Sequence, residues 1–81
     1  MRDVKVYTTS NCGYCNSAKQ LLKTAGMAFE EINLDNKAEL RMKLSEENGH
    51  YRTVPMIFVD GKFIGGFTEL QALHKQGKLI G

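Results

Sequence analysis

The chain has 81 residues, which is the size of one small domain, and its 42% hydrophobic residues are enough for one core. A net charge of +2, with basic residues scattered among nearly as many acidic ones, argues against nucleic-acid binding. This length predicts a single domain over residues 1–81. No apolar run is long enough to cross a bilayer, so we predict a cytoplasmic location and no membrane partner.

The first part of the chain predicts a strand, a helix and a second strand. Residues 4–9 (VKVYTT) are rich in β-branched and aromatic side chains, which favours a strand. Apolar residues then recur at helical spacing from Gly13 to Ala25, and Gly26 is a stop signal. Residues 28–34 (AFEEINL) predict a second strand, which should run parallel to the first because a helix connects them.

The middle of the chain predicts a second helix and a hairpin. Asn36, followed three residues later by Glu39, is typical of a helix cap, and the residues NGHY at 48–51 end that helix. Residues 56–59 (MIFV) and 62–64 (KFI) flank an Asp-Gly pair, which predicts a tight turn between two antiparallel strands.

Thr68, with Gln71 three residues later, predicts the N-cap of a last helix that ends near Gly77. The predicted order is therefore β-α-β-α-β-β-α. A parallel pair together with an antiparallel hairpin makes this an α/β fold with a mixed sheet.

The two cysteines, Cys12 and Cys15, lie where the first strand passes into the first helix. Backbone N–H groups at a helix N-terminus stabilise an anion, and both such positions and Cys-X-X-Cys motifs favour the thiolate form of cysteine. Cys12 is therefore the predicted nucleophile, and Cys15, one helical turn further on, is the predicted resolving thiol. Gly13 is expected to allow a tight turn that leaves the Cys12 sulfur open to approach.

A zinc site and a pair of buried structural thiols are the alternatives for this cysteine pair. Zinc requires four ligands, and the only histidines, His50 and His74, are 24 residues apart rather than at zinc-finger spacing. A corner between a strand and a helix, next to a glycine, is expected to be exposed, which disfavours buried thiols.

Three segments resemble the glutaredoxin family, the glutathione-dependent branch of the thioredoxin fold. YTTSNCGYCNSAKQLL (7–22) is similar to its Cys-X-Tyr-Cys segment, RTVP (52–55) to its proline loop, and IGGFTEL (64–70) to its Gly-Gly turn. The resemblance implies a thioredoxin-like fold with a four-stranded mixed sheet flanked by helices. It also implies an enzyme that reduces protein disulfides and glutathione mixed disulfides through Cys12 and Cys15. Glutathione would be a co-substrate, and no cofactor would be tightly bound.

The resemblance further implies a glutathione site. A cis Pro55 would turn the backbone of Val54 toward Cys12, where it could pair with the cysteine residue of glutathione. Glycines before the last helix would admit the γ-glutamyl end, whose carboxylate would meet the helix N-terminus and whose amine would meet an acid. The implied glutathione-binding residues are Tyr14, Arg41, Thr53, Val54, Pro55, Gly66, Thr68 and Glu69.

The sequence departs from the common family pattern at three positions. Thr9 stands where many members carry Lys or Arg, so Arg41 is expected to meet the glycine carboxylate instead. Glu69 replaces the usual aspartate, which keeps the charge but lengthens the side chain. Gly13 replaces the common proline, as in some members that share a 2Fe–2S cluster between two protomers. Cys12 would be a metal ligand only in such a dimer, which would also contain two glutathiones.

The expected partners are glutathione and client proteins that carry a disulfide or a bound glutathione. Ribonucleotide reductase is a client suggested by the family alone, and a monomer is expected. One alternative is a redoxin dedicated to ribonucleotide reductase and reduced by thioredoxin reductase. Thioredoxins carry a tryptophan beside their Cys-X-X-Cys motif, and this chain contains no tryptophan, which argues against that alternative. The other alternative is an iron–sulfur cluster carrier.

Overall fold

The computed structural model describes residues 3–51 and 53–77. Its strands and helices follow the predicted order β-α-β-α-β-β-α. The elements are β1 (Val4–Thr8), α1 (Gly13–Thr24), β2 (Glu30–Asn33), α2 (Ala38–Glu47), β3 (Met56–Val59), β4 (Lys62–Gly65) and α3 (Phe67–Lys75).

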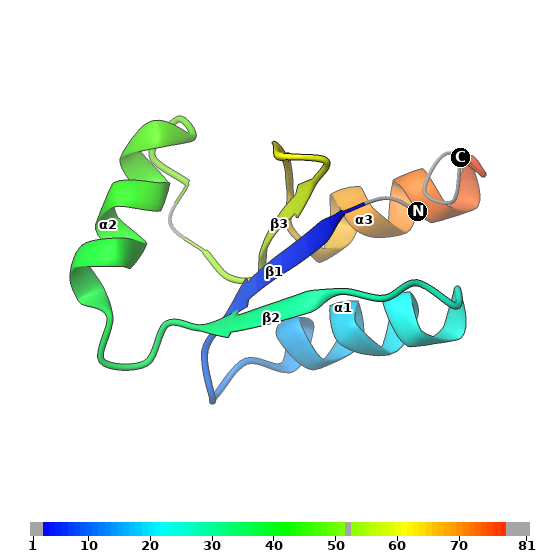
Figure 1. The fold of residues 1–81 in the computed structure, drawn as a ribbon, viewed down its shortest axis with the longest axis horizontal. Helices are drawn as coiled ribbons and strands as arrows, with labels where there is room; N and C mark the ends of the chain where they lie inside the picture. The colour runs from blue at the N-terminus through cyan, green and yellow to red at the C-terminus, as the bar shows by residue number, and fades with distance from the viewer. Residues whose placement is uncertain (1–2, 52, 78–81) are drawn as a thin grey trace.

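The four strands form one mixed sheet in the order β2-β1-β3-β4 (Figure 1). Strand β1 pairs with β2 in parallel, with Val6 opposite Glu31, and with β3 in antiparallel orientation, with Val6 opposite Ile57. Strands β3 and β4 are antiparallel, with an irregularity between Ile57 and Phe58. The predicted mixed four-stranded sheet is therefore confirmed.

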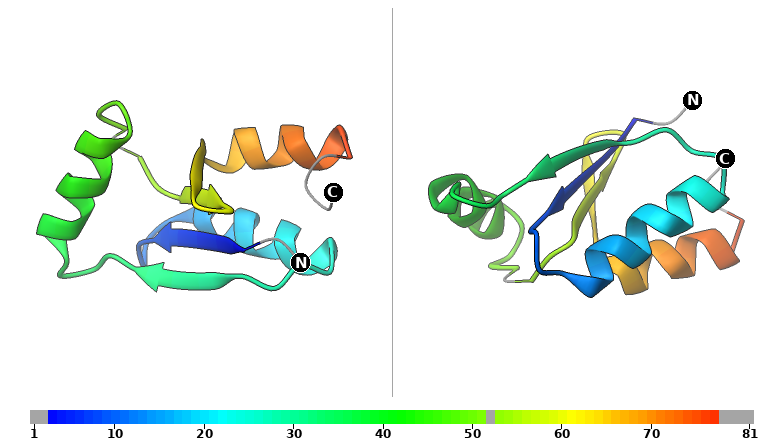
Figure 2. Two further views of the ribbon diagram at one scale, coloured as in Figure 1. Left: turned by 45° about the horizontal axis from the view of Figure 1, so that its top comes forward. Right: turned by 90° about the horizontal axis from the view of Figure 1, so that it is seen from below.

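One face of the sheet packs on α1 and α3, which lie side by side (Figure 2). Alternate residues of β1 and β3 point toward these helices, as the two-residue period of a strand requires. The side chains buried on this face are Val4, Val6, Ala18, Leu22, Ile57, Val59 and Leu70. This core fixes the start of α1, and hence Cys12, at the end of β1.

The opposite face of the sheet packs against α2. The buried side chains there are Leu34, Leu44 and Met56, and Tyr51 and Val54 pack beside them. The loop between α2 and β3 is thereby fixed against the core as it approaches the start of α1. The fold thus brings together the strand–helix corner before α1 and the loop between α2 and β3, which are far apart in the sequence.

The chain turns mostly where the sequence predicts. Gly26, just after α1, has a φ of 73°, a left-handed conformation that suits glycine and ends the helix. Asp60 and Gly61 have φ values of 53° and 81°, as in the two-residue hairpin turns favoured between antiparallel strands. Both predictions are confirmed.

Two predicted helix caps are wrong. Asn36 has a φ of 62° and lies in the turn before α2, whose N-cap is Lys37. Asparagine tolerates this left-handed conformation, which explains its position in a turn rather than at a cap. Thr68 is the second residue of α3, and the N-cap is Gly66. The carboxylate of Glu69 replaces a side-chain cap, because its Oε1 accepts a hydrogen bond from the Gly66 amide at 2.7 Å.

Within residues 3–51 and 53–77, the helices are too short and too polar for any of them to span a bilayer.

Candidate active site

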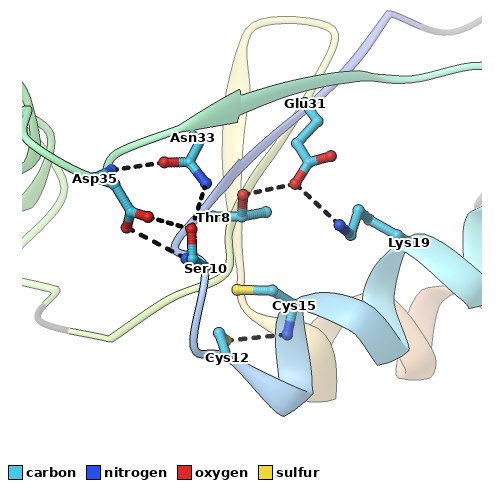
Figure 3. Close-up of polar contacts among 8 residues, drawn as sticks. All are labelled: Thr8, Ser10, Cys12, Cys15, Lys19, Glu31, Asn33 and Asp35. Carbon is cyan, nitrogen blue, oxygen red and sulfur yellow. Dashed lines mark hydrogen bonds and ion pairs between the residues drawn. The ribbon is translucent and has the colours of Figure 1, made fainter.

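Cys12 is the N-cap residue of α1, with φ −137° and ψ 107°. Its Sγ accepts a hydrogen bond from the backbone N–H of Cys15 at 3.1 Å (Figure 3). The same sulfur lies 3.6 Å from the carbonyl oxygen of Val54. The side chain is partly exposed. A sulfur that reaches solvent and accepts a bond from the free N–H groups of a helix end is suited to react as a thiolate.

Cys15 is buried, with 1% of its surface exposed. Burial, together with the neighbouring Cys12 side chain, raises the pKa of its thiol to about 12, although the Thr9 backbone and the charge of Lys19 act in the opposite direction. At neutral pH Cys15 is therefore a protonated thiol. The two cysteines differ in the way that a nucleophile and a resolving thiol must differ.

The structure corrects the role expected of Gly13. It is the first residue of α1, and a Cβ at this position would meet no atom within 4 Å. No tight turn here requires glycine, and the first helical position accepts most residues, including proline.

A groove of about 310 Å³ lies beside Cys12, whose Sγ is 3.6 Å from the carbonyl oxygen of the lining residue Val54. Seven of the eight residues expected to bind glutathione line it, and the Val54–Pro55 peptide bond is cis, as predicted. Tyr51 and Phe67 also line the groove, although the sequence did not indicate Tyr51 as a site residue. The lining residues are Tyr14, Tyr51, Thr53, Val54, Pro55, Gly66, Phe67, Thr68 and Glu69.

Gly66 lines this groove, and Gly65 precedes it at the end of β4. Gly65 has a φ of 118°, and a Cβ at this position would overlap the Glu69 carboxylate. A Cβ on Gly66 would lie 2.6 Å from Tyr51 Oη and 3.3 Å from the Pro55 carbonyl oxygen. The absence of both side chains lets Glu69 fold back over the start of α3 and keeps the groove open.

Tyr14 also lines the groove. It is 68% exposed, and its ring lies 6.1 Å from that of Phe67, with a tilt of 31° between the ring planes. Aromatic pairs favour such an offset arrangement. Tyr14 thus stands at the first turn of α1, next to Cys12, with its exposed surface available to a bound molecule.

Arg41 is the one expected site residue that does not line this groove. It faces a second groove of about 520 Å³ along α2, together with Met42, Glu46 and His50. Tyr51 lies between the two grooves and lines both of them. The structure therefore separates Arg41 from the remainder of the predicted site by one aromatic side chain.

The described residues contain no group of three or more His, Cys, Asp or Glu side chains that could hold a metal ion. Cys15 is buried, and the two histidines lie on α3 and in the loop after α2. The geometry of residues 3–51 and 53–77 therefore gives no support to a zinc site.

Comparison with known proteins assigns the chain to a family. The family model for glutaredoxin matches residues 4–64, from the start of β1 into β4. The chain belongs to the glutaredoxin family. A glutaredoxin of Pseudomonas aeruginosa is 46% identical over 79 residues, which cover 98% of this chain and 93% of that protein. Glutaredoxin 3 of Escherichia coli K12 is 40% identical over 79 residues, which cover 98% of this chain and 94% of that protein.

Solved glutaredoxin structures have the same fold. The crystal structure of a buckwheat glutaredoxin–glutathione complex matches with a TM-score of 0.91 and 33% identity, covering 98% of this chain and 74% of that one. The holo form of glutaredoxin C1 from a poplar hybrid, Populus tremula × tremuloides, matches with a TM-score of 0.89 and 35% identity over 95% of this chain and 71% of that one. Membership of this family implies thiol–disulfide oxidoreductase activity.

Proposed function

We propose that this glutaredoxin is a glutathione-dependent dithiol oxidoreductase that reduces protein disulfides and glutathione mixed disulfides. One observation carries the proposal: the partly exposed Cys12 sulfur lies 3.6 Å from Val54 O, at the edge of the groove that Val54 and Pro55 line. A peptide thiol in that groove would reach the sulfur. The buckwheat relative, whose fold matches closely, is a glutathione complex.

The groove offers groups that suit each part of glutathione. The backbone of Val54 can pair with the cysteine residue of the tripeptide, as one strand pairs with another. The γ-glutamyl carboxylate can meet the N–H groups at the start of α3, where Thr68 adds a hydroxyl. One oxygen of Glu69 is used by the Gly66 amide, which leaves the other for the γ-glutamyl amine. Tyr14 would flank the glycine end.

The chemistry begins at Cys12. Its thiolate attacks a client disulfide, forming a mixed disulfide and releasing one client thiolate, which takes up a proton. Cys15 then attacks the Cys12 sulfur, the intramolecular disulfide forms, and the second client thiol leaves. Two molecules of glutathione reduce the Cys12–Cys15 disulfide and become glutathione disulfide. For a glutathionylated client, Cys12 takes the glutathione, and a second glutathione removes it without Cys15.

The proposal includes the cellular location, the client proteins and the oligomeric state. Glutathione-dependent reduction requires a reducing compartment, which supports a cytoplasmic location. The clients are proteins with an accessible disulfide or a bound glutathione, and ribonucleotide reductase is a candidate on family grounds alone. We propose that the protein acts as a monomer, since one chain supplies both cysteines and the groove.

Turnover of a glutathione mixed disulfide by three proteins tests the function. The wild type should be active, Cys12→Ser should lose activity by at least about a hundredfold because the nucleophile is gone, and Cys15→Ser should keep a substantial part. Equal loss in both variants would exclude the route that needs only Cys12. Full activity of Cys12→Ser would exclude Cys12 as the nucleophile.

The choice of reductant separates this function from that of a thioredoxin-like redoxin. The oxidised protein is incubated either with glutathione and glutathione reductase or with thioredoxin reductase, each with NADPH, and free thiols are counted. Glutathione should restore both cysteines. Reduction by thioredoxin reductase alone would contradict the proposal.

The iron–sulfur alternative gains no specific support from the site. A 2Fe–2S cluster requires four ligands, and with Cys15 buried one chain presents only the Cys12 sulfur. A cluster would therefore require a second protomer and two external thiols. Anaerobic incubation with iron, sulfide and glutathione should leave a colourless monomer. A visible absorbance band in a dimer would instead support the cluster carrier.

A further inference from the structure

A chain of polar contacts lies beside the buried Cys15. The Thr8 hydroxyl donates to Glu31 Oε2 at 2.8 Å, and Lys19 Nζ lies 3.0 Å from the same oxygen. Figure 3 shows the Cys15 side chain leaving α1 below Thr8, while the Lys19 side chain extends from the same helix to Glu31. Three elements, β1, β2 and α1, therefore meet in one polar cluster next to a cysteine sulfur.

Lys19 is placed to act on Cys15. The two residues are four positions apart on α1, so their side chains leave the same face of the helix one turn apart. The Lys19 side chain is only 25% exposed, which is low for a lysine, because Glu31 holds it against the sheet. Thr8, itself 1% exposed, in turn fixes the Glu31 carboxylate.

Cys15 needs such a cation when it acts. Burial raises the pKa of its thiol to about 12, so the resolving attack has to create a thiolate where water is largely excluded. The charge of Lys19 lowers the pKa of Cys15 and so opposes the effect of burial. The other charged group that the cluster brings to this side is Glu31, whose negative charge alone would disfavour the thiolate.

We propose that Lys19, held in place by Glu31 and Thr8, is the cation that stabilises the developing thiolate of Cys15 in the resolving step. Glu31 and Thr8 are then positioning residues for Lys19. The inference rests on the proposed function, because it concerns the step in which Cys15 acts. It also predicts a division of labour: Lys19 supports the reduction of protein disulfides, which uses Cys15, and not the clearance of glutathione from Cys12.

In the resolving step the Cys15 thiol gives up its proton, and its sulfur attacks Sγ of Cys12 in the mixed disulfide. The Cys12–Cys15 bond forms as the bond from Cys12 to the client sulfur breaks. The client sulfur leaves with the electron pair and takes up a proton, directly or through water. The dithiol is oxidised by two electrons, and the client disulfide is reduced by two.

The test follows each cysteine separately with one equivalent of 5,5′-dithiobis(2-nitrobenzoate), an aromatic disulfide. Attack by Cys12 releases a first coloured thiolate, and attack by Cys15 on the resulting adduct releases a second, so rapid mixing resolves the two steps. In Lys19→Met the first release should be unchanged and the second about three- to fivefold slower, as for loss of one partly exposed charge interaction. The rate of the second release should also rise with pH about half a pH unit later than in wild type, because a threefold change in rate corresponds to about half a pKa unit.

Two control variants distinguish a specific effect of the Lys19 charge on Cys15 from a general effect of removing a positive charge from α1. Lys19→Arg keeps the charge and should restore the second release to within about twofold of wild type. Lys23→Met removes a cation one turn further along α1 and should change neither release. Thermal unfolding of each variant confirms that it is folded. An unchanged second release in Lys19→Met, or an equal slowing in Lys23→Met, would overturn the proposal.

A double-mutant cycle tests the positioning role. In the Glu31→Gln background Lys19 is no longer held, so Lys19→Met should slow the second release by less than it does in wild type. Equal effects in both backgrounds would show that Glu31 does not position Lys19. Failure of the first release, or of glutathione turnover, in the wild type would instead count against the proposed function itself.

Discussion

The backbone nitrogen of Cys15 lies 3.1 Å from Sγ of Cys12, so the second cysteine of the pair donates a hydrogen bond to the first. The donor belongs to the backbone, and it survives replacement of the Cys15 side chain. A sulfur accepts this bond more strongly as a thiolate than as a thiol. The helix that buries Cys15, the proposed resolving thiol, therefore also supports Cys12, the proposed nucleophile, and the two proposed roles can be separated by substitution.

The first prediction concerns the selectivity of alkylation. A short treatment of the reduced protein with iodoacetamide at neutral pH should modify Cys12 and spare Cys15, because Cys15 is 1% exposed and its pKa is raised to about 12. Peptide fragmentation in a mass spectrometer locates the label. In Cys12→Ser the remaining thiol should react only after denaturant is added. Rapid labelling of Cys15 in that folded variant would contradict the assigned burial.

The second prediction is a loss of stability at alkaline pH. The folded state raises the pKa of Cys15 from its ordinary value of 9.0 to about 12, so folding favours the protonated thiol. This contribution is complete below about pH 9 and is lost as the pH rises toward 12, because the unfolded chain ionises first. The free energy of unfolding of the reduced protein, measured with urea, should therefore fall over this range.

Cys15→Ser provides the control for that measurement. Lysine and tyrosine side chains titrate in the same range in both proteins, so the difference between the two curves isolates the thiol. The wild-type curve should fall more steeply than that of the variant. Parallel curves would mean that Cys15 titrates alike in the folded and unfolded states.

Much of the fold could be predicted from local signals in the sequence. The apolar stripe of α1, its stop at Gly26 and the Asp60–Gly61 turn each specify local structure, and all were found as expected. The two wrong caps have a common cause: sequence shows which residues are able to cap a helix, but not which backbone conformation they adopt. Asn36 adopts a turn, and Glu69 satisfies the start of α3 in place of Thr68.

The site was only partly predictable, because it depends on which segments the sheet order brings together. The cysteine pair carries its own signal at a strand–helix boundary. Tyr51 carries none, since its contact with Gly66 arises only when the loop before β3 meets the start of α3. The separation of Arg41 from the groove likewise depends on the position of Tyr51, which the helical pattern of α2 does not specify.

The third prediction concerns the loop that precedes Cys12. Both the backbone N–H and the hydroxyl of Ser10 donate to the Asp35 carboxylate, which ties this loop to the turn after β2 (Figure 3). These hydrogen bonds lower the pKa of Asp35. Their contribution to stability is therefore fully present above the ordinary pKa of an aspartate, and it is lost as the pH falls through the lowered pKa of the folded protein. Asp35→Ala should remove it at every pH.

Amide hydrogen exchange followed by NMR tests this tie. In Asp35→Ala at neutral pH the Ser10 amide should exchange several-fold faster than in wild type, because its acceptor is gone. The Asn48 side chain, which donates to the Leu44 carbonyl at the end of α2, provides a remote reference that should not change. Unaltered exchange at Ser10 would mean that the Asp35 carboxylate does not protect this amide.

The fourth prediction concerns the space above Gly66. A Cβ at this position would lie 2.6 Å from Tyr51 Oη, closer than such atoms can approach, so Gly66→Ala should displace the tyrosine into the groove. The residue has a φ of −108°, so the effect is one of space and not of backbone strain. Overpacking of this kind costs about 1–3 kcal/mol. Because the displaced tyrosine occupies the groove, this cost should weaken glutathione binding and raise the KM for glutathione about tenfold.

Tyr51→Phe tests whether the effect of Gly66→Ala comes from a clash with the tyrosine hydroxyl. Removing the hydroxyl takes away the atom that the new methyl group would meet, whereas the Pro55 carbonyl oxygen, at 3.3 Å, requires only a small shift. Gly66→Ala combined with Tyr51→Phe should therefore bind glutathione more tightly than Gly66→Ala alone, although each single substitution is neutral or harmful. Such a reversal identifies a direct steric conflict between the two positions. Strictly additive effects would show that Gly66 acts by some other route than its contact with Tyr51.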